Sequence, residues 1–348
     1  MLIGGKELEI PIIQGGMGVG VSLSSLAGNV AKCGGMGVIS SVNAGYNEMD
    51  FPQNPLEANL RALKKEIKKA KEIAGEKGLI AVNIMTAVSH FGDTCKCAAL
   101  AGADAIISGA GLPMDLPAYV KGTKTLCAPI VSSARAAKLL IKRWLKHYDC
   151  KPDFLVVEGS EAGGHLGFSK EELLEGSAQS NEEILKEVLE VAEDIPVFVA
   201  GGVYDGADMA KYCKMGAAGI QLATRFIATN ECDASDVFKQ VIVNARKEDI
   251  QIIASPVGMP ARAIKSPMLE RIKKGEKFPA VRCNGCLTAC PKNDSIPYCI
   301  SRALIEAVKG NWKDGLFFTG SNAYRVTEIK KVSEVIDEIM GQYQEAAK

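Results

Sequence analysis

The chain has 348 residues, more than the ~250 of a typical α/β barrel and fewer than two average domains with their linkers would need. Its 41 basic side chains balance 41 acidic ones, and hydrophobic residues make up 47% of the sequence, which excludes a disordered chain and argues against a nucleic-acid partner. We therefore expect one large domain with an appendage.

The N-terminal segment MLIGGKELEIP has no basic stretch followed by a long apolar one. No later run reaches the ~18 apolar residues that a membrane-spanning helix needs. These patterns predict a cytoplasmic protein without a membrane partner. The cysteine count is 11, an odd number in a chain too large to need disulfide bonds for its stability, which indicates reduced thiols or a metal site.

Short runs rich in Val and Ile alternate with longer amphipathic stretches along the first two thirds of the chain. The runs are apolar at consecutive positions, which is typical of parallel strands that are covered on both faces. The eight predicted strands are 10–16, 37–41, 79–85, 105–111, 128–133, 153–159, 195–202 and 218–226.

The stretches between the strands have the spacing of amphipathic helices. Apolar residues recur every three or four positions in 56–74 and 134–148. Asn181 is the predicted N-cap of a helix that runs to about Glu193, with acidic residues in its first turn. A repeat of about 27 residues per strand and helix favours an α/β fold of the (β/α)8 TIM-barrel type over an open doubly wound sheet.

The alternation of strands and helices ends near residue 255. We predict a barrel over residues 1–255 and a C-terminal extension over 256–348, which contains a cysteine-rich segment and two helices at 300–308 and 332–344. The extension has little apolar surface of its own, so we expect its terminal helix to pack on the barrel.

Glycines and polar residues follow the last two predicted strands. In a TIM barrel the active site lies at the carboxyl ends of the strands, and the loops after strands seven and eight commonly bind phosphate. Main-chain N–H groups here, with the Thr224 hydroxyl, can hold a phosphoryl group. Neither G-x-G-x-x-G after a strand nor a P-loop motif occurs, so a dinucleotide or P-loop site is not supported. The glycines and polar residues that follow the last two predicted strands, and that we expect to bind the phosphate, are Gly201, Gly202, Gln221, Ala223 and Thr224.

One histidine stands out among the three in the sequence. His165 follows the sixth predicted strand within GSEAGGHLG, where glycines would leave its ring accessible. We expect it to titrate near neutral pH and to exchange a proton with a bound substrate. A purely structural histidine held by hydrogen bonds in the loop is the alternative. His90, after the third strand, can line the same mouth, whereas His147 lies in a surface helix pattern.

Four cysteines form the pattern C-x2-C-x3-C-P-x7-C, with Cys283, Cys286, Cys290 and Cys299. Short-spaced thiolates of this kind are the ligands of zinc and of iron–sulfur clusters. A 4Fe–4S cluster, a structural zinc ion and unligated thiols stay open as alternatives, the last because a reduced cysteine packs as a small apolar residue.

Six segments taken together resemble one family. PIIQGGMG, VNIM, SGAG, GSEAGGHLG, VAGGV and GIQLATRFIAT, in this order over roughly residues 10–230, resemble the nitronate monooxygenases, formerly called 2-nitropropane dioxygenases. The FMN-dependent enoyl-[acyl-carrier-protein] reductases share the same pattern, and the segments do not separate the two activities.

The resemblance implies a flavoprotein with FMN in the barrel mouth. It implies an oxidoreductase that converts alkyl nitronates and O2 to a carbonyl compound and nitrite, with His165 as the catalytic acid or base. The alternatives are an NAD(P)H-dependent enoyl thioester reductase and a barrel that binds flavin without turnover. We expect a small-molecule substrate and leave a homodimer open. The FMN-binding residues that the resemblance implies are Gly15, Gly16, Met17, Asn83, Glu161, Gly163, Gly201, Gly202, Gln221, Ala223 and Thr224.

Overall fold

The computed structural model describes residues 1–291 and 296–348. In this part of the chain eight parallel strands close into a barrel, because the first of them, β3, pairs with the last, β11. This closure confirms the predicted TIM barrel and rules out the open doubly wound sheet. In chain order the wall strands are β3 (Ile12–Gln14), β4 (Met36–Ser40), β5 (Leu79–Asn83), β6 (Ala105–Ser108), β7 (Leu126–Val131), β8 (Leu155–Glu158), β10 (Val197–Ala200) and β11 (Gly219–Leu222).

Successive residues of a wall strand pack on opposite sides of the barrel. In β10, Val197 and Val199 belong to the core between the sheet and the helices, whereas Phe198 and Ala200 belong to the core inside the barrel. Both faces are therefore buried, which explains why the strands are apolar at most consecutive positions. A short N-terminal hairpin of β1 (Leu2–Ile3) and β2 (Lys6–Glu7) adds apolar side chains to the inner core.

The side chain of Gln14 reinforces the pairing of β3 with β4. These strands share a single register pair, Ile13 with Met36. Gln14 is fully buried, donates from Nε2 to the Val38 carbonyl (3.2 Å) and accepts at Oε1 from the Val38 N–H (3.0 Å). The amide therefore satisfies a buried peptide group that would otherwise be unpaired.

Helices surround the barrel between the strands. Helix α7 begins one residue earlier than predicted: the N-cap is Ser180, whose hydroxyl accepts from the Glu183 N–H while the Glu183 carboxylate accepts from the Ser180 N–H. Asn181 is therefore the first helical residue, because this reciprocal capping box outcompetes an asparagine cap. The helices are α1 (Ser24–Lys32), α2 (Pro55–Ala74), α3 (Phe91–Leu100), α4 (Leu116–Val120), α5 (Ala134–Tyr148), α7 (Asn181–Ala192) and α8 (Gly206–Lys214).

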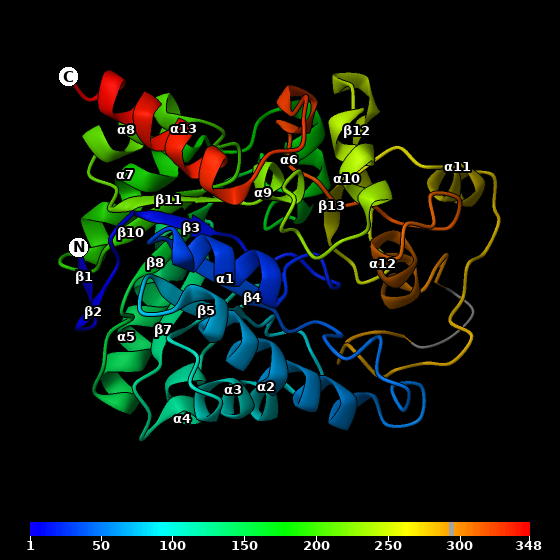
Figure 1. Cartoon of the computed structure of the whole chain (residues 1–348), viewed down its shortest axis with the longest axis horizontal. Helices are drawn as coiled ribbons and strands as arrows, with labels where there is room; N and C mark the ends of the chain where they lie inside the picture. The colour runs from blue at the N-terminus through cyan, green and yellow to red at the C-terminus, as the bar shows by residue number, and fades with distance from the viewer. Residues whose placement is uncertain (292–295) are drawn as a thin grey trace.

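The C-terminal helix α13 (Val332–Ala346) lies in the outer layer of the barrel. It packs along α8 and also contacts α1 (Figure 1). Gly206 permits the close contact, since a Cβ there would collide with the backbone of α13. Helix α13 thus occupies the place of the eighth barrel helix, while the chain between β11 and α13 forms an insertion at the mouth. The division of the chain at residue 255 stays a prediction.

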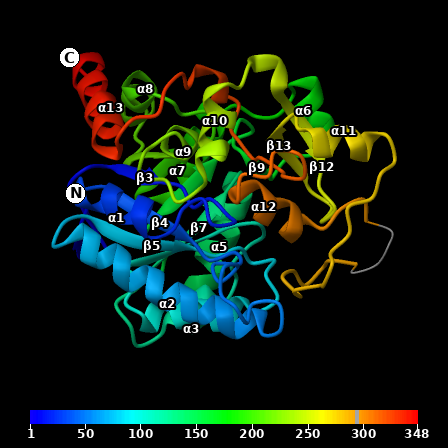
Figure 2. The same ribbon diagram turned by 45° about the vertical axis from the view of Figure 1, so that its right-hand side comes forward.

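The insertion builds a second, small sheet beside the barrel. Strands β12 (Ile250–Ala254) and β13 (Pro260–Ile264) form an antiparallel hairpin, and β13 also pairs with β9 (Gly164–His165). This sheet and helix α12 lie close together in Figure 2. Within the described ranges, no helix is long and apolar enough to cross a membrane. The other elements are α6 (Lys170–Glu175), α9 (Thr224–Ile227), α10 (Asp236–Val243), η1 (Lys247–Asp249), α11 (Pro267–Lys273), α12 (Ile300–Val308) and η2 (Ala323–Arg325).

Candidate active site at the carboxyl ends of the barrel strands

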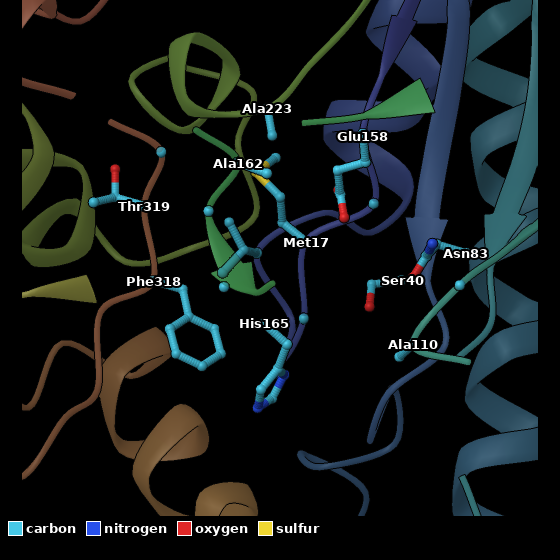
Figure 3. A pocket seen from close by; sticks show the side chains of 18 of the residues that line it. Met17, Ser40, Asn83, Ala110, Glu158, Ala162, His165, Ala223, Phe318 and Thr319 are labelled. Atoms are coloured by element: carbon cyan, nitrogen blue, oxygen red, sulfur yellow. The ribbon is translucent and has the colours of Figure 1, made fainter. Parts of the chain in front are cut away.

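A cavity of about 310 Å³ opens at the carboxyl ends of the barrel strands. Its walls come from the loops after the strands and from several parts of the insertion, among them 257–259, 286–290, 300–304 and 318–322. Figure 3 shows Phe318 and Thr319 at this wall. The structure brings His165 and all the residues predicted to bind the cofactor into this one cavity, namely Gly15, Gly16, Met17, Asn83, Glu161, Gly163, Gly201, Gly202, Gln221, Ala223 and Thr224.

One end of the cavity is a cradle of main chain. Gly201 and Gly202 both have left-handed backbones, with φ of 83° and 84°. A Cβ at Gly201 would lie 2.8 Å from the Gly159 carbonyl oxygen, and one at Gly202 would collide with the Glu161 carboxylate. Glycine therefore suits both positions, because other residues rarely adopt this backbone and a side chain at Gly201 would press on fixed main chain.

The segment 318–322 packs against this cradle and covers it. The Gly320 N–H donates to Thr224 Oγ1 (3.0 Å), and Asn322 Nδ2 donates to the Gly202 carbonyl (2.5 Å). The hydroxyls of Thr319 and Ser321 are buried and have no hydrogen-bond partner among the described residues. Buried hydroxyls are seldom left unpaired, so this end of the cavity suits an anion or another acceptor.

The residues alone do not predict the cradle segment 318–322. The family resemblance implies that GSNAYRV (320–326), with Tyr324, is a late segment that returns near the flavin, with a plain hairpin as the alternative. Its GSN sequence is a weak turn signal, and only the folded chain brings it beside β11. The role of Gly163 becomes clear from the same contact: a Cβ there would lie 2.5 Å from the Thr319 carbonyl carbon. Gly163 therefore permits the packing of two main-chain segments.

The other end of the cavity lies over β3 and β5. A Cβ at Gly16 would collide with the side chain of Asn83, so the glycine loop lies directly against the end of β5. Asn83 donates from Nδ2 to the Ile107 carbonyl (3.3 Å), which fixes its amide. Figure 3 shows Met17, Ser40 and Asn83 around this part of the opening. A planar ligand can lie along this surface.

The added sheet positions His165. The residue lies in β9 and pairs with Ala261 of β13. Its Nε2 is 2.8 Å from Ser255 Oγ, and the Phe318 ring packs edge-on against the imidazole with centroids 5.3 Å apart. Three segments distant in sequence therefore hold the ring at the cavity wall.

Burial lowers the pKa of His165 from 6.5 to about 4. The expectation of a histidine that titrates near neutral pH was therefore wrong, because removal from water disfavours the charged imidazolium. At physiological pH the ring is neutral, which is the form that can accept a proton from a bound molecule.

A half-buried arginine holds the loop that precedes His165. The Arg262 guanidinium donates to the carbonyls of Ser160 (2.9 Å) and Ala162. Burial lowers the pKa of Arg262, and the Glu161 carboxylate opposes this shift. Because charge-assisted bonds to backbone carbonyls are stronger than neutral ones, Arg262 keeps the loop over the end of β8.

Glu158 is a site residue that sequence reasoning missed. It ends strand β8, and Figure 3 shows its carboxyl directed into the cavity. No hydrogen bond or ion pair joins its side chain to the described residues, and burial raises its pKa from 4.5 to about 7. The available signal was a single acidic residue at the end of an apolar strand, DFLVVEG.

The Glu158 pKa gives a testable dependence of stability on pH. A carboxyl whose folded pKa is raised destabilises the fold when ionised, so its full stability is present below pH 4.5 and is lost as the pH rises through about 7. We expect Glu158→Gln to raise the free energy of unfolding of the flavin-free protein little at pH 5 and by up to about 3 kcal/mol at pH 8. Urea unfolding measures the difference. An equal gain at both pH values, or a similar gain in the exposed-site control Glu190→Gln, would contradict the assignment.

The cysteine segment lies at the edge of the same cavity. Cys286 and Cys290 line it, Cys299 is half-buried at the start of α12, and Cys283 is exposed. Every cysteine is a free thiol. Across residues 1–291 and 296–348, no group of three or more His, Cys, Asp or Glu side chains is arranged closely enough to hold a single metal ion.

The remaining histidines lie away from the chemistry. His147 is exposed on α5, as predicted. His90 precedes α3, lies 3.6 Å from the Asp93 carboxylate and does not line the cavity. His165 is thus the histidine that the fold brings to the cavity.

Comparison with known proteins gives a family. Residues 1–342 match the model of the family described as nitronate monooxygenase. A probable nitronate monooxygenase of Staphylococcus saprophyticus is 24% identical over 77% of this chain and 79% of its own length. An indene-carboxyl-CoA dehydrogenase of Mycobacterium tuberculosis is 26% identical over 78% of this chain and 67% of its own length. The match to the dehydrogenase of the same name from Rhodococcus jostii covers 65% of the length of that protein.

Two solved structures illustrate the similarity of this fold to known proteins. FabK from Thermotoga maritima has a TM-score of 0.74 and 26% identity, covering 97% of this chain and 94% of that one. A nitroalkane oxidase from Streptomyces ansochromogenes has a TM-score of 0.73 and 21% identity, with 97% of each chain covered, and shows the fold alone.

Proposed function

The chain belongs to the nitronate monooxygenase family of flavin-dependent oxidoreductases, and we propose that it uses FMN to oxidise alkyl nitronates with O2 to a carbonyl compound and nitrite. The observation that carries the proposal is the placement of a half-buried imidazole, His165, in the same cavity as the glycine turn Gly201–Gly202.

The residues of the cavity fit FMN. Gly201 and Gly202 form a cradle that a Cβ would fill, and the unpaired hydroxyls of Thr319 and Ser321 lie beside it, as a phosphate requires. Gly16, Met17 and Asn83 would hold the ring system at the other end. When bound, the flavin supplies the capacity to accept electrons from the substrate and pass them to O2.

The protein contributes orientation and a base. In the tautomer in which Nε2–H donates to Ser255 Oγ, Nδ1 is the ring nitrogen that can take the Cα proton of a neutral nitroalkane. Phe318 and the loop held by Arg262 fix the ring and shield it from bulk water, which keeps the imidazole in the neutral form that can accept a proton. A nitronate is already deprotonated and does not need this step.

A second candidate is the FMN-dependent reduction of an enoyl thioester. It is favoured by the likeness to FabK over 97% of the chain and to a CoA-thioester dehydrogenase. The side of the cavity formed by the insertion is apolar and could contain an acyl chain, with Leu287, Ile300 and Leu304 in its wall.

A direct comparison of substrates tests the proposal. The purified enzyme with bound FMN is incubated with ethyl nitronate in air, and we expect nitrite release with matching O2 uptake. Anaerobic flavin reduction by NAD(P)H, followed by reoxidation with crotonyl thioester and no nitrite from nitronate, would instead establish the enoyl reductase.

A further inference from the structure

One acidic side chain in the cavity takes no part in the proposed reaction. Glu158 is the last residue of β8 and lines the cavity, and Figure 3 shows its carboxyl directed into the opening. Its side chain forms no hydrogen bond or ion pair with residues 1–291 or 296–348. Because polar groups removed from water usually have a partner, this carboxyl is suited to a partner that enters the cavity.

The register of the barrel strands turns Glu158 inward. It pairs with Ala200 of β10, and Ala200 pairs in turn with Gln221 of β11. Directly paired residues of neighbouring strands point to the same side of a sheet, and Ala200 belongs to the core inside the barrel. Glu158, Ala200 and Gln221 therefore form one row across three strands, and all three line the floor of the cavity.

Apolar side chains close the space beneath this row. Val156 of β8 pairs with Phe198 of β10 in the next layer of the barrel interior, and both are fully buried. The ring of Phe154 packs edge-on against that of Phe198, with centroids 5.6 Å apart. The carboxyl of Glu158 thus has apolar core below it and the cavity above it, so a hydrogen-bond partner must come from the cavity.

No cation in the described wall of the cavity balances a charge on Glu158. The guanidinium of Arg225, which lines the cavity, pairs with Glu338 (2.9 Å). Burial alone raises the pKa of Glu158 to about 7, so the carboxyl keeps its proton at lower pH and offers an O–H donor. The other titratable groups of the described wall do not shift this pKa, and they are Glu161, His165, Tyr204, Cys286 and Cys290.

The row on the cavity floor offers two hydrogen-bonding groups to one ligand. Gln221 is buried, and its amide also lacks a side-chain partner among the described residues. Glu158 and Gln221 lie on strands two apart, roughly 10 Å from each other, with the small Ala200 between them. A planar heterocycle with several acceptor atoms, such as the ring system of FMN, can lie across this row.

We propose that Glu158 is held as a neutral carboxylic acid and donates a hydrogen bond to the ring system of FMN from the floor of the cavity. The inference rests on the proposed binding of FMN and is independent of the substrate that the enzyme oxidises or reduces. An ionised Glu158 has no proton to donate and would face the acceptor atoms of the ring with negative charge. FMN therefore binds the protonated form in preference, and its affinity falls as the pH rises through about 7.

The test is the dissociation constant of FMN for the flavin-free protein at pH 6 and pH 8.5, measured by fluorescence titration. Glu158→Gln keeps an N–H donor that cannot ionise, so the ratio of its constant to that of the wild type cancels the titration of the FMN phosphate. We expect the wild type to lose affinity relative to Glu158→Gln by about tenfold between the two pH values. A ratio that stays constant, or one that moves in the opposite direction, would refute the donor.

Two further variants separate this contact from a structural role. Glu158→Met removes the donor but keeps the length of the side chain, and we expect it to weaken FMN binding about three- to tenfold at pH 6. Glu190→Gln, an exposed position on α7, should bind as the wild type does at both pH values. Circular dichroism checks that each variant has folded.

The outcomes distinguish this contact from the cofactor itself. Equal affinity of Glu158→Met and Glu158→Gln at pH 6 would show that the side chain does not bind the ring, while the proposed function would stand. A wild-type protein that fails to bind FMN at either pH would overturn the cofactor and this contact together.

Discussion

Replacing His165 with Asn is expected to lower the turnover of neutral nitroalkanes about 10²–10⁴-fold, the contribution of a general base. Asparagine cannot accept the Cα proton at the pH of the assay, although it keeps a polar side chain of similar size next to Ser255. Turnover of nitronates, which carry no proton to remove, should fall much less. Nitrite release from nitroethane and from ethyl nitronate, measured on the same preparation, gives both rates.

The matched control is His147→Asn, which changes an exposed histidine on α5. It should leave both rates unchanged. The kcat/KM of the wild-type enzyme for nitroethane reports on groups of the free enzyme. It should stay constant down to about pH 5, because the neutral form of His165 persists until the pH approaches about 4. An equal loss of activity on both substrates in His165→Asn would indicate that the ring positions the substrate instead of taking its proton.

The barrel could be predicted from the sequence because both faces of its strands are buried. That burial produces runs of apolar residues such as 195–202, which local periodicity detects. The role of α13 could not be predicted in the same way. The insertion between Leu222 and Val332 separates the eighth helix from its strand, and only tertiary packing against α8 places it in the ring.

The site residues that could be predicted are those that the barrel topology alone brings to one end of the barrel. Glycines after the strands of a TIM barrel meet at one end, so Gly201 and Gly16 could be assigned to one mouth. Ser255, Arg262 and Phe318 could not, because the added sheet and the segment before Thr319 reach the cavity through contacts that are distant in sequence. The pKa of His165 was misjudged for a related reason: the sequence does not show how far a ring is removed from water.

Replacing Gly201 with Ala is expected to weaken FMN binding at least tenfold. The residue has φ of 83°, where an alanine costs about 1–3 kcal/mol, and the new Cβ would lie 2.8 Å from the Gly159 carbonyl oxygen and 3.0 Å from its nitrogen. Neither is a flexible side chain, so the cradle must open, and the main-chain N–H groups that would bind the phosphate are displaced. Fluorescence titration of the flavin-free protein with FMN gives the dissociation constant.

Gly275→Ala separates this effect from general backbone strain. Gly275 has φ of 90° just after α11, and a Cβ there would meet nothing within 4 Å. Both variants should lose stability from the left-handed backbone, measured by urea unfolding, with the larger loss in Gly201→Ala because of its added contact with main chain, while only Gly201→Ala loses flavin. If both bind FMN as the unmodified protein does, the phosphate does not lie in the Gly201–Gly202 turn. If both lose it, the loss comes from the fold as a whole, because Gly275 is far in sequence from the cradle and lines no part of the cavity.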